Sequence, residues 1–94
     1  MGRAGIRLYG KARKRIPGGT QLLSKRPEMF LPGRWPAYYD RAKGVEVWDL
    51  DGNRYLDMCY CGIGSCVLGF ADPDVDAAVK DAVERGSMAT LNCP

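Results

Sequence analysis

The sequence predicts an α+β fold that consists of a short helix, an extended segment, a small three-stranded antiparallel sheet, a glycine-rich loop and an amphipathic helix. Apolar residues at helical spacing, near the amino terminus and around residue 80, predict the two helices. Alternating apolar and polar residues, interrupted by two turn sequences, predict the sheet. The expected segments are residues 1–19 (helix and following turn), 20–36 (extended and proline-rich), 37–58 (sheet), 59–71 (glycine-rich loop), 72–86 (helix) and 87–94 (irregular).

The length and composition are those of one small soluble domain. The chain has 94 residues, of which 46% are hydrophobic and 27% are charged, and these values exclude wholesale disorder. A chain of this length buries only about 60 to 65% of the surface that its unfolded form exposes, so the core should be thin. No apolar run approaches the ~20 residues of a membrane span, and the basic start lacks the apolar stretch of a secretory signal. We therefore expect a cytosolic protein.

The first helix is expected over residues 5–16. The apolar residues that recur there at helical spacing are Leu8, Tyr9, Ala12 and Ile16. The Pro17-Gly18-Gly19 sequence should end this helix.

The segment 20–36 contains three prolines and Gly33, which exclude a regular helix and a central strand. We expect it to run extended along another surface. Its large apolar side chains are Met29, Phe30, Leu31 and Trp35. This apolar group is too large to face water alone, and it indicates that further protein surface covers it.

Three short strands are expected at residues 38–42, 45–49 and 54–58, with turns at Lys43-Gly44 and Asp51-Gly52. Two registers compete at the second turn. A two-residue type I′ turn would pair Val47 with Leu56. A type I turn followed by a bulge would place Gly52 in the left-handed region, and Asp49 at the first position favours this second register.

The glycine-rich loop and the second helix follow the sheet. The glycines of residues 59–71 predict a close approach of the backbone to another part of the protein, and the loop lacks the Gly-Lys-Ser/Thr of a phosphate-binding loop. Asp72 is the expected helix cap, and Gly86 the expected end. The apolar side chains that should form one buried stripe are Val75, Ala78, Val79, Ala82 and Val83.

The four cysteines are Cys59, Cys61, Cys66 and Cys93. We expect free, mostly buried thiols, because a disulfide framework needs a secreted context that the sequence does not indicate. A small thiolate-metal module is the alternative, since four thiolates can close a tetrahedral zinc shell. The spacing lacks paired Cys-x-x-Cys sequences and the chain has no histidine, so no metal site is predicted.

Charge is distributed unevenly along the chain. Residues 1–43 hold eleven Lys or Arg against two acids, a balance of +9, whereas residues 44–94 hold three against nine, a balance of −6. A basic nucleic-acid-binding module is one interpretation, with residues 11–15 as its densest cluster. A solvated helix face explains this cluster more simply, because no base-stacking aromatic array accompanies it. The remaining interpretation is that the basic and acidic halves of the chain bind each other or a larger partner.

The order of motifs from Trp48 to Pro73 carries a resemblance to a known family. The hairpin Trp48-Asp49-x-Asp51-Gly52-Asn53-x-Tyr55-x-Asp57 precedes a Leu68-Gly69-x-x-x-Pro73 turn and a helix. This order resembles the amino-terminal segment of class III pyridoxal-phosphate-dependent aminotransferases. Ile16-Pro17-Gly18-Gly19 and the positions of Gly64, Leu68, Gly69 and Pro73 are most similar to the glutamate-1-semialdehyde 2,1-aminomutase group. The resemblance implies the amino-terminal small-domain segment of a fold type I pyridoxal-phosphate enzyme.

The resemblance also implies substrate-side residues, namely Lys25, Ile63 and Gly64. Lys25 stands where the aminomutases carry an arginine that helps to hold a substrate carboxylate, and it keeps the charge without the bidentate fork. Ile63 stands where they carry a tryptophan near the substrate. These departures imply a relative that acts on a different amino or keto substrate.

The cofactor implied for the complete enzyme is pyridoxal 5′-phosphate, held by a lysine of the large domain. No lysine of this chain has the family's sequence context for that role, so the resemblance implies no catalytic or cofactor-binding residue here and a piece that is inactive alone. The apolar segment 29–35 and the one-sided stripe of the second helix predict that the isolated piece is marginally stable and tends to associate. The implied partners are the remainder of the aminotransferase chain, a second subunit in a homodimer, and a small-molecule amino donor and acceptor. Nucleic acid and membrane are not expected partners.

Overall fold

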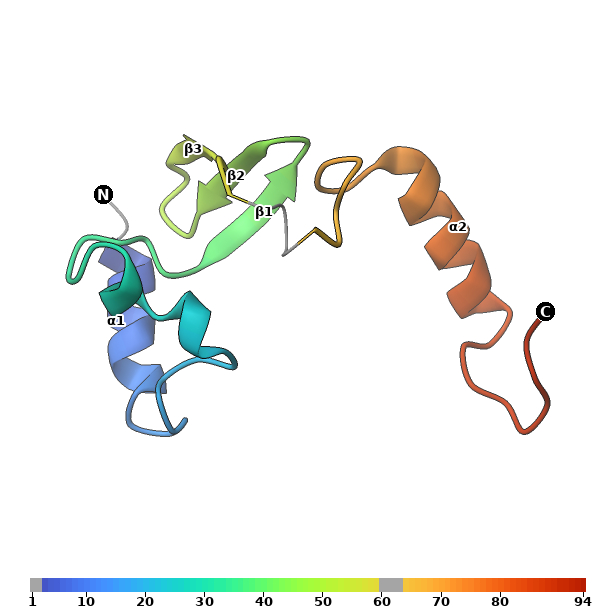
Figure 1. Cartoon of the computed structure of the whole chain (residues 1–94), viewed down its shortest axis with the longest axis horizontal. Helices are drawn as coiled ribbons and strands as arrows, with labels where there is room; N and C mark the ends of the chain where they lie inside the picture. Colours follow the sequence, from blue (N-terminus) through green and yellow to red (C-terminus); the bar gives the residue numbers. More distant parts are fainter. Residues whose placement is uncertain (1–2, 60–63) are drawn as a thin grey trace.

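The computed structural model describes residues 3–59 and 64–94 and has the predicted α+β architecture (Figure 1). Its elements in chain order are α1 (Arg3–Ala12), the short 3-10 helices η1 (Leu23–Lys25) and η2 (Pro27–Met29), β1 (Tyr39–Lys43), β2 (Glu46–Asp49), β3 (Arg54–Leu56) and α2 (Pro73–Glu84). The radius of gyration is 16.3 Å, against about 12 Å for a compact domain of this length. The chain is therefore open, and α2 stands apart from α1 and the sheet.

Helix α1 lies against the segment that precedes the sheet. An added Cβ at Gly5 would stand 1.9 Å from the carbonyl oxygen of Pro36, so the helix backbone approaches closely there. Tyr9 of this helix is 8% exposed, and Pro27 is buried as well. The helix ends at Ala12, earlier than predicted, and the chain continues in turns to Ile16. Pro17 disfavours helical backbone in the residue before it.

The expectation that residues 20–36 run extended is wrong in part, because η1 and η2 interrupt them. Pro27 occupies the first position of η2, where its fixed φ suits a helical turn and its missing N–H has no cost. Phe30 stacks on Trp35 with ring centroids 4.4 Å apart. Met29 is 59% exposed and Phe30 is 48% exposed, so these two side chains face outward, whereas Trp35 is half-buried.

The sheet is antiparallel with strand order β1-β2-β3. Val47 pairs with Tyr55, which contradicts the two-residue turn and its pairing of Val47 with Leu56. The N–H of Gly52 donates to the carbonyl of Asp49 at 3.1 Å, and Gly52 has φ of 83°. These features confirm the type I turn with a bulge. Its cause is local, since the Asp49 carboxylate accepts the backbone N–H groups of Asp51 and Asn53, each at 2.9 Å.

The glycine-rich loop approaches the sheet where glycines permit it. Gly44 and Phe70 exchange two backbone hydrogen bonds of 2.8 Å, and an added Cβ at Gly69 would lie 3.1 Å from Gly44 Cα. Lys43 Nζ donates to the carbonyl of Ala71 at 2.7 Å. The predicted close backbone approach is confirmed at Gly69.

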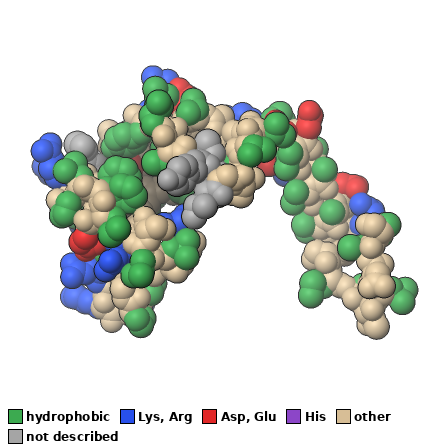
Figure 2. Space-filling view, in the orientation of Figure 1, with side chains coloured by type: hydrophobic (Ala, Val, Ile, Leu, Met, Phe, Trp, Pro, Cys, Tyr) green, Lys and Arg blue, Asp and Glu red, His purple; other side chains and the backbone are tan. Residues whose placement is uncertain are grey.

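Helix α2 has the predicted ends but not the predicted burial. Asp72 Oδ2 accepts the N–H of Val75 at 3.1 Å, and Gly86 has φ of 97°. The expectation of a buried stripe is wrong for the described structure: Val75 is 47% exposed, Val79 54% and Val83 60%. Figure 2 shows apolar side chains along this separate helix. The stripe is exposed because none of the described elements covers it.

Neither helix of the described segments has both the length and the apolar character to cross a membrane.

Candidate functional site

Lys25 lies at the end of η1, beside a hollow of about 280 Å³ that we call the aromatic hollow. The backbone leaves the 3-10 helix at this point, because Arg26 has an extended conformation and Pro27 begins η2. The aromatic side chains that line the hollow are Phe30, Trp35, Tyr38, Tyr39, Trp48 and Tyr55. Lys25 is the single basic residue among its lining residues. Asp49 and Asp57 also line the hollow, so among these lining residues Lys25 is the one that suits the carboxylate of a small molecule with an apolar body.

Asp49 forms part of this wall, and its role there is structural. It is 3% exposed and accepts the Tyr55 hydroxyl at 3.0 Å and the Asn53 side-chain amide at 3.0 Å, besides two backbone N–H groups. Burial raises the pKa of Asp49, but the hydrogen bonds from Asn53, Tyr55 and Asp51 outweigh it and hold the pKa below its ordinary value. The Asp49 carboxylate is therefore ionised at neutral pH, and its hydrogen bonds stabilise the hairpin.

Tyr55 complements this carboxylate. Burial, and then its hydrogen bond to Asp49, raise the pKa of the Tyr55 hydroxyl. The phenol thus stays protonated near neutral pH and serves as a hydrogen-bond donor to Asp49. This pair stabilises the hairpin wall of the aromatic hollow rather than supplying an acid or a base.

Of the three predicted substrate-side residues, the two that the structure describes, Lys25 and Gly64, do not line a common hollow. Lys25 borders the aromatic hollow and a second one of about 450 Å³, and Gly64 is absent from the lining of both. Gly64 has φ of 78°, is exposed, and has no heavy atom within 4 Å of an added Cβ. Ile63 lies outside the described residues. The assignment of all three therefore stays a prediction.

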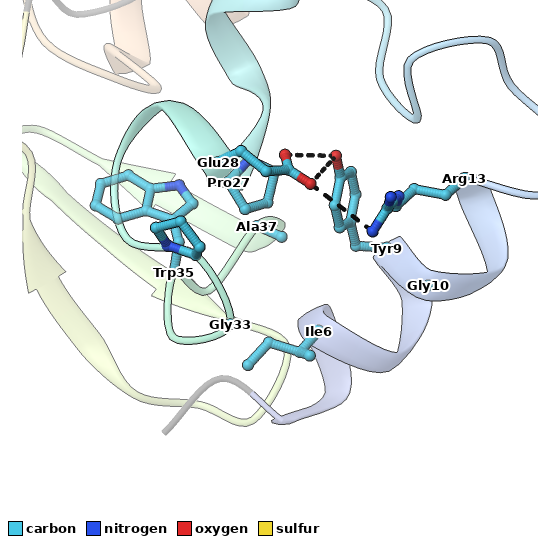
Figure 3. A pocket seen from close by; sticks show the side chains of 10 residues that line it. Ile6, Tyr9, Gly10, Arg13, Pro27, Glu28, Gly33, Trp35 and Ala37 are labelled. Carbon is cyan, nitrogen blue, oxygen red and sulfur yellow. Dashed lines mark hydrogen bonds and ion pairs between the residues drawn. The ribbon is translucent and has the colours of Figure 1, made fainter.

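The sequence did not predict the pair of Tyr9 and Glu28, which joins α1 to η2. The Tyr9 hydroxyl lies 2.8 Å from Glu28 Oε2 and 3.1 Å from Oε1, and Arg13 Nη1 lies 3.9 Å from Oε1 (Figure 3). The hydrogen bond from Tyr9 lowers the pKa of Glu28, while burial and the same bond raise the pKa of Tyr9. The sequence does contain one signal for this pair, because Glu28 is the single acidic residue among residues 1–39.

The cysteines of the described residues are free thiols, and the expectation that they are mostly buried is wrong. Cys59 and Cys93 are exposed and Cys66 is half-buried, because they lie in loops that no described element covers. Cys61 lies outside the described residues. Within the described ranges, no three His, Cys, Asp or Glu side chains gather as metal ligands.

The described residues do not fit a pyridoxal-phosphate site by themselves. A phosphorylated pyridine needs several phosphate donors and an acid for its ring nitrogen besides the lysine. Lys25 has no second basic residue beside it in the aromatic hollow, and the Asp49 oxygens there already accept hydrogen bonds.

The described residues combine a small antiparallel sheet, an Asp-capped helix and an aromatic hollow bordered by a lysine. Residues 32–94 match the family model described as Aminotransferase class-III. The chain belongs to the class III aminotransferases.

Two sequence relatives agree with this family. The chain is 35% identical over 78 residues to the 3-aminobutyryl-CoA aminotransferase of Cloacimonas acidaminovorans, which covers 83% of this chain and 18% of that protein. It is 48% identical over 52 residues to the glutamate-1-semialdehyde 2,1-aminomutase of Thermoplasma acidophilum, which covers 55% of this chain and 12% of that protein. The resemblance predicted from the motifs is confirmed.

Two solved structures share the fold. An omega-transaminase from Sphaerobacter thermophilus matches with a TM-score of 0.78 and 27% identity, over 96% of this chain and 19% of that one. The pyridoxal-phosphate internal aldimine form of the FumI protein from Sphingopyxis sp. MTA144 matches with a TM-score of 0.72 and 29% identity, over 96% of this chain and 20% of that one. The chain spans about one-fifth of the length of these structures.

Proposed function

We propose that these residues are the amino-terminal part of a pyridoxal-phosphate-dependent aminotransferase or aminomutase-like enzyme. The enzyme moves an amino group between an amino acid or amino compound and a keto acid or aldehyde. Membership of the class III family carries this proposal, together with an aminotransferase relative of which the chain covers 18%.

The Schiff-base lysine comes, in this proposal, from residues beyond the 94. The bound cofactor supplies an electron sink for the substrate carbanion. The lysines of this chain are Lys11, Lys14, Lys25, Lys43 and Lys80. Lys43 donates a hydrogen bond to the carbonyl of Ala71, and Lys25 is the single basic residue that lines the aromatic hollow, which supports a catalytic lysine elsewhere.

Lys25, Ile63 and Gly64 form the substrate side of the active-site mouth. The exposed ammonium group of Lys25 attracts the substrate carboxylate at the edge of the aromatic hollow. Because an ammonium group is a point charge and not a planar fork, it accepts a carboxylate in more orientations than an arginine does. This difference supports a substrate other than that of the aminomutases.

The complete enzyme is proposed to be a homodimer in the cytoplasm. The outward-facing apolar residues of η2 and α2 support burial against further protein surface, whether of the same chain or of a second subunit. The free thiols of the described cysteines suit a reducing compartment. Light scattering on the full-length protein tests the dimer, and a monomer at micromolar concentration contradicts it.

The decisive experiment compares the full-length protein with the 94-residue piece. After addition of pyridoxal 5′-phosphate, the full-length protein should show the visible absorption band of bound cofactor, and an amino donor should change it. The 94-residue piece should show neither. A cofactor band in the isolated piece, or none in the full-length protein, contradicts the proposal.

Lys25→Ala and Lys25→Arg test the substrate contact. Loss of a charge-assisted contact of about 1.5–3 kcal/mol predicts that Lys25→Ala raises KM roughly 10- to 100-fold for a donor with a carboxylate. The same change should leave KM unaltered for an amine without a carboxylate, and Lys25→Arg should restore most of the affinity. Equal effects on both donors contradict a carboxylate contact.

A further inference from the structure

A polar hollow lies between the end of α1, the turn at Gly18-Gly19 and the start of η2. Its volume is about 250 Å³, and the residues that line it are Tyr9, Arg13, Gly18, Gly19, Arg26 and Glu28. It shares no residue with the aromatic hollow. We call it the arginine hollow, because two guanidinium groups and a single carboxylate supply its charges.

The Glu28 carboxylate leaves hydrogen-bond donors of the Arg13 and Arg26 guanidinium groups unpaired within the described residues. Both Glu28 oxygens accept the Tyr9 hydroxyl, at 2.8 and 3.1 Å, whereas Arg13 stays 3.9 Å from the nearer oxygen and makes no hydrogen bond to it (Figure 3). Arg26 makes no ion pair within the described residues. The hollow therefore has an excess of positive charge and unused N–H donors.

Arg26 carries a further sign of an incomplete contact. Its Nε is buried and has no hydrogen-bond partner among the described residues. A buried donor without a partner is costly, by roughly 1–3 kcal/mol, and needs an explanation. An anion that draws the guanidinium toward the hollow would give this nitrogen an acceptor.

Glycine keeps this space open. An added Cβ at Gly19 would lie 2.8 Å from the Tyr9 ring and 2.9 Å from Arg13 Cγ, and Gly19 has φ of 81°. The surroundings are basic as well, because residues 11–15 hold four Lys or Arg. Figure 2 shows Lys and Arg side chains gathered around the end of α1. A concave site within such a field concentrates anions.

We propose that Arg13 and Arg26 bind a small oxyanion in this hollow, the phosphate or carboxylate group of a small molecule. The planar guanidinium fork matches two oxygens of either group. A volume of about 250 Å³ lies below the 300–1,000 Å³ usual for drug-sized ligands, so the occupant is small. The arginine hollow is distinct from the aromatic hollow and shares only Gly19 with the second hollow that Lys25 borders.

The test is calorimetric titration of the full-length protein, saturated with pyridoxal 5′-phosphate so that the cofactor's own phosphate site is filled. Phosphate, acetate and chloride are compared at constant ionic strength. Saturable binding of phosphate or acetate with Kd of about 1 mM, and none of chloride, is expected. The two oxyanion titrations show which group the site prefers.

Variants assign the binding to this hollow. Arg26→Gln should weaken binding about tenfold or more, since it removes a charge-assisted contact. Glu28→Gln should tighten it by roughly threefold or more, because it removes the opposing charge. Arg15→Gln, a change at an exposed arginine that belongs to the basic cluster but does not line the hollow, should weaken binding by about twofold or less, because its charge acts only at a distance and is screened by salt.

Three results would overturn the proposal: no saturable heat up to about 50 mM oxyanion, equal weakening by Arg15→Gln, or weaker binding by Glu28→Gln. If Arg26→Gln does not fold, Arg13→Gln replaces it and must weaken binding to a similar extent. A purely structural role for the arginines does not produce opposite effects of Arg26→Gln and Glu28→Gln on Kd.

Discussion

Asp49→Asn removes the charge at the centre of the hairpin while it keeps the shape of the side chain. The remaining oxygen can still accept the backbone N–H groups of Asp51 and Asn53. The new amide group, however, faces the Asn53 side-chain amide and the Tyr55 hydroxyl, which donate to Oδ2 in the native protein. Hydrogen bonds to a charged group contribute roughly 1.5–3 kcal/mol, so we expect a local destabilisation of that size.

Hydrogen exchange measures this effect locally, whatever the length of the protein. The backbone N–H groups of Asp51 and Asn53 should exchange roughly 10- to 100-fold faster in Asp49→Asn than in the native protein at neutral pH. Asp40→Asn is the matched control, because Asp40 lies in the same sheet, is exposed, and has no hydrogen bond or ion pair through its side chain within the described residues.

The pH dependence of the difference between the native protein and Asp49→Asn is a second test. The folded-state pKa of Asp49 lies below the ordinary 3.8. Its contribution to stability is therefore complete above that ordinary value and is lost as pH falls through the lower folded-state pKa. The difference between the native protein and Asp49→Asn should shrink in this acidic range. If Asp49→Asn exchanges like Asp40→Asn at neutral pH, the account of the hairpin is wrong.

Two further predictions concern α1. Gly5→Ala should destabilise the protein by about 1–3 kcal/mol, because the new Cβ meets a main-chain carbonyl oxygen. Gly10→Ala in the same helix has open space around its Cβ and should stabilise the protein by about 0.5–1 kcal/mol. Chemical denaturation compares the two variants, and equal effects contradict the close approach at Gly5. Tyr9→Phe removes the largest cause that lowers the pKa of Glu28, so NMR titration should find the pKa of Glu28 raised in this variant, and an unchanged value contradicts the hydrogen bond.

The sequence predicted the features that depend on a few neighbouring residues. The hairpin register follows from Asp49 and Gly52, because the carboxylate and the left-handed glycine close the turn within five residues. The ends of α2 follow in the same way from Asp72 and Gly86. Each of these turn and cap signals acts between residues that are close together in the sequence.

Features that depend on distant surfaces were not predictable. Helical spacing identifies the apolar face of α2, but the spacing does not say which surface covers that face. The pair of Tyr9 and Glu28 joins residues 19 apart, across a proline-rich segment whose course depends on η1 and η2. The arginine hollow depends on that course too, because Arg26 lies between these two turns.

The bridge between Gly44 and Phe70 has a consequence for the order of folding. The hairpins of β1, β2 and β3 join residues that are close in sequence, and such hairpins form within about 1–10 μs. Lys43 and Ala71, by contrast, are 28 residues apart, so their contact must first meet the entropy of closing a long loop. We expect the sheet to form before α2 is attached, and the final direction of α2 to be fixed last, by whatever packs on its valines.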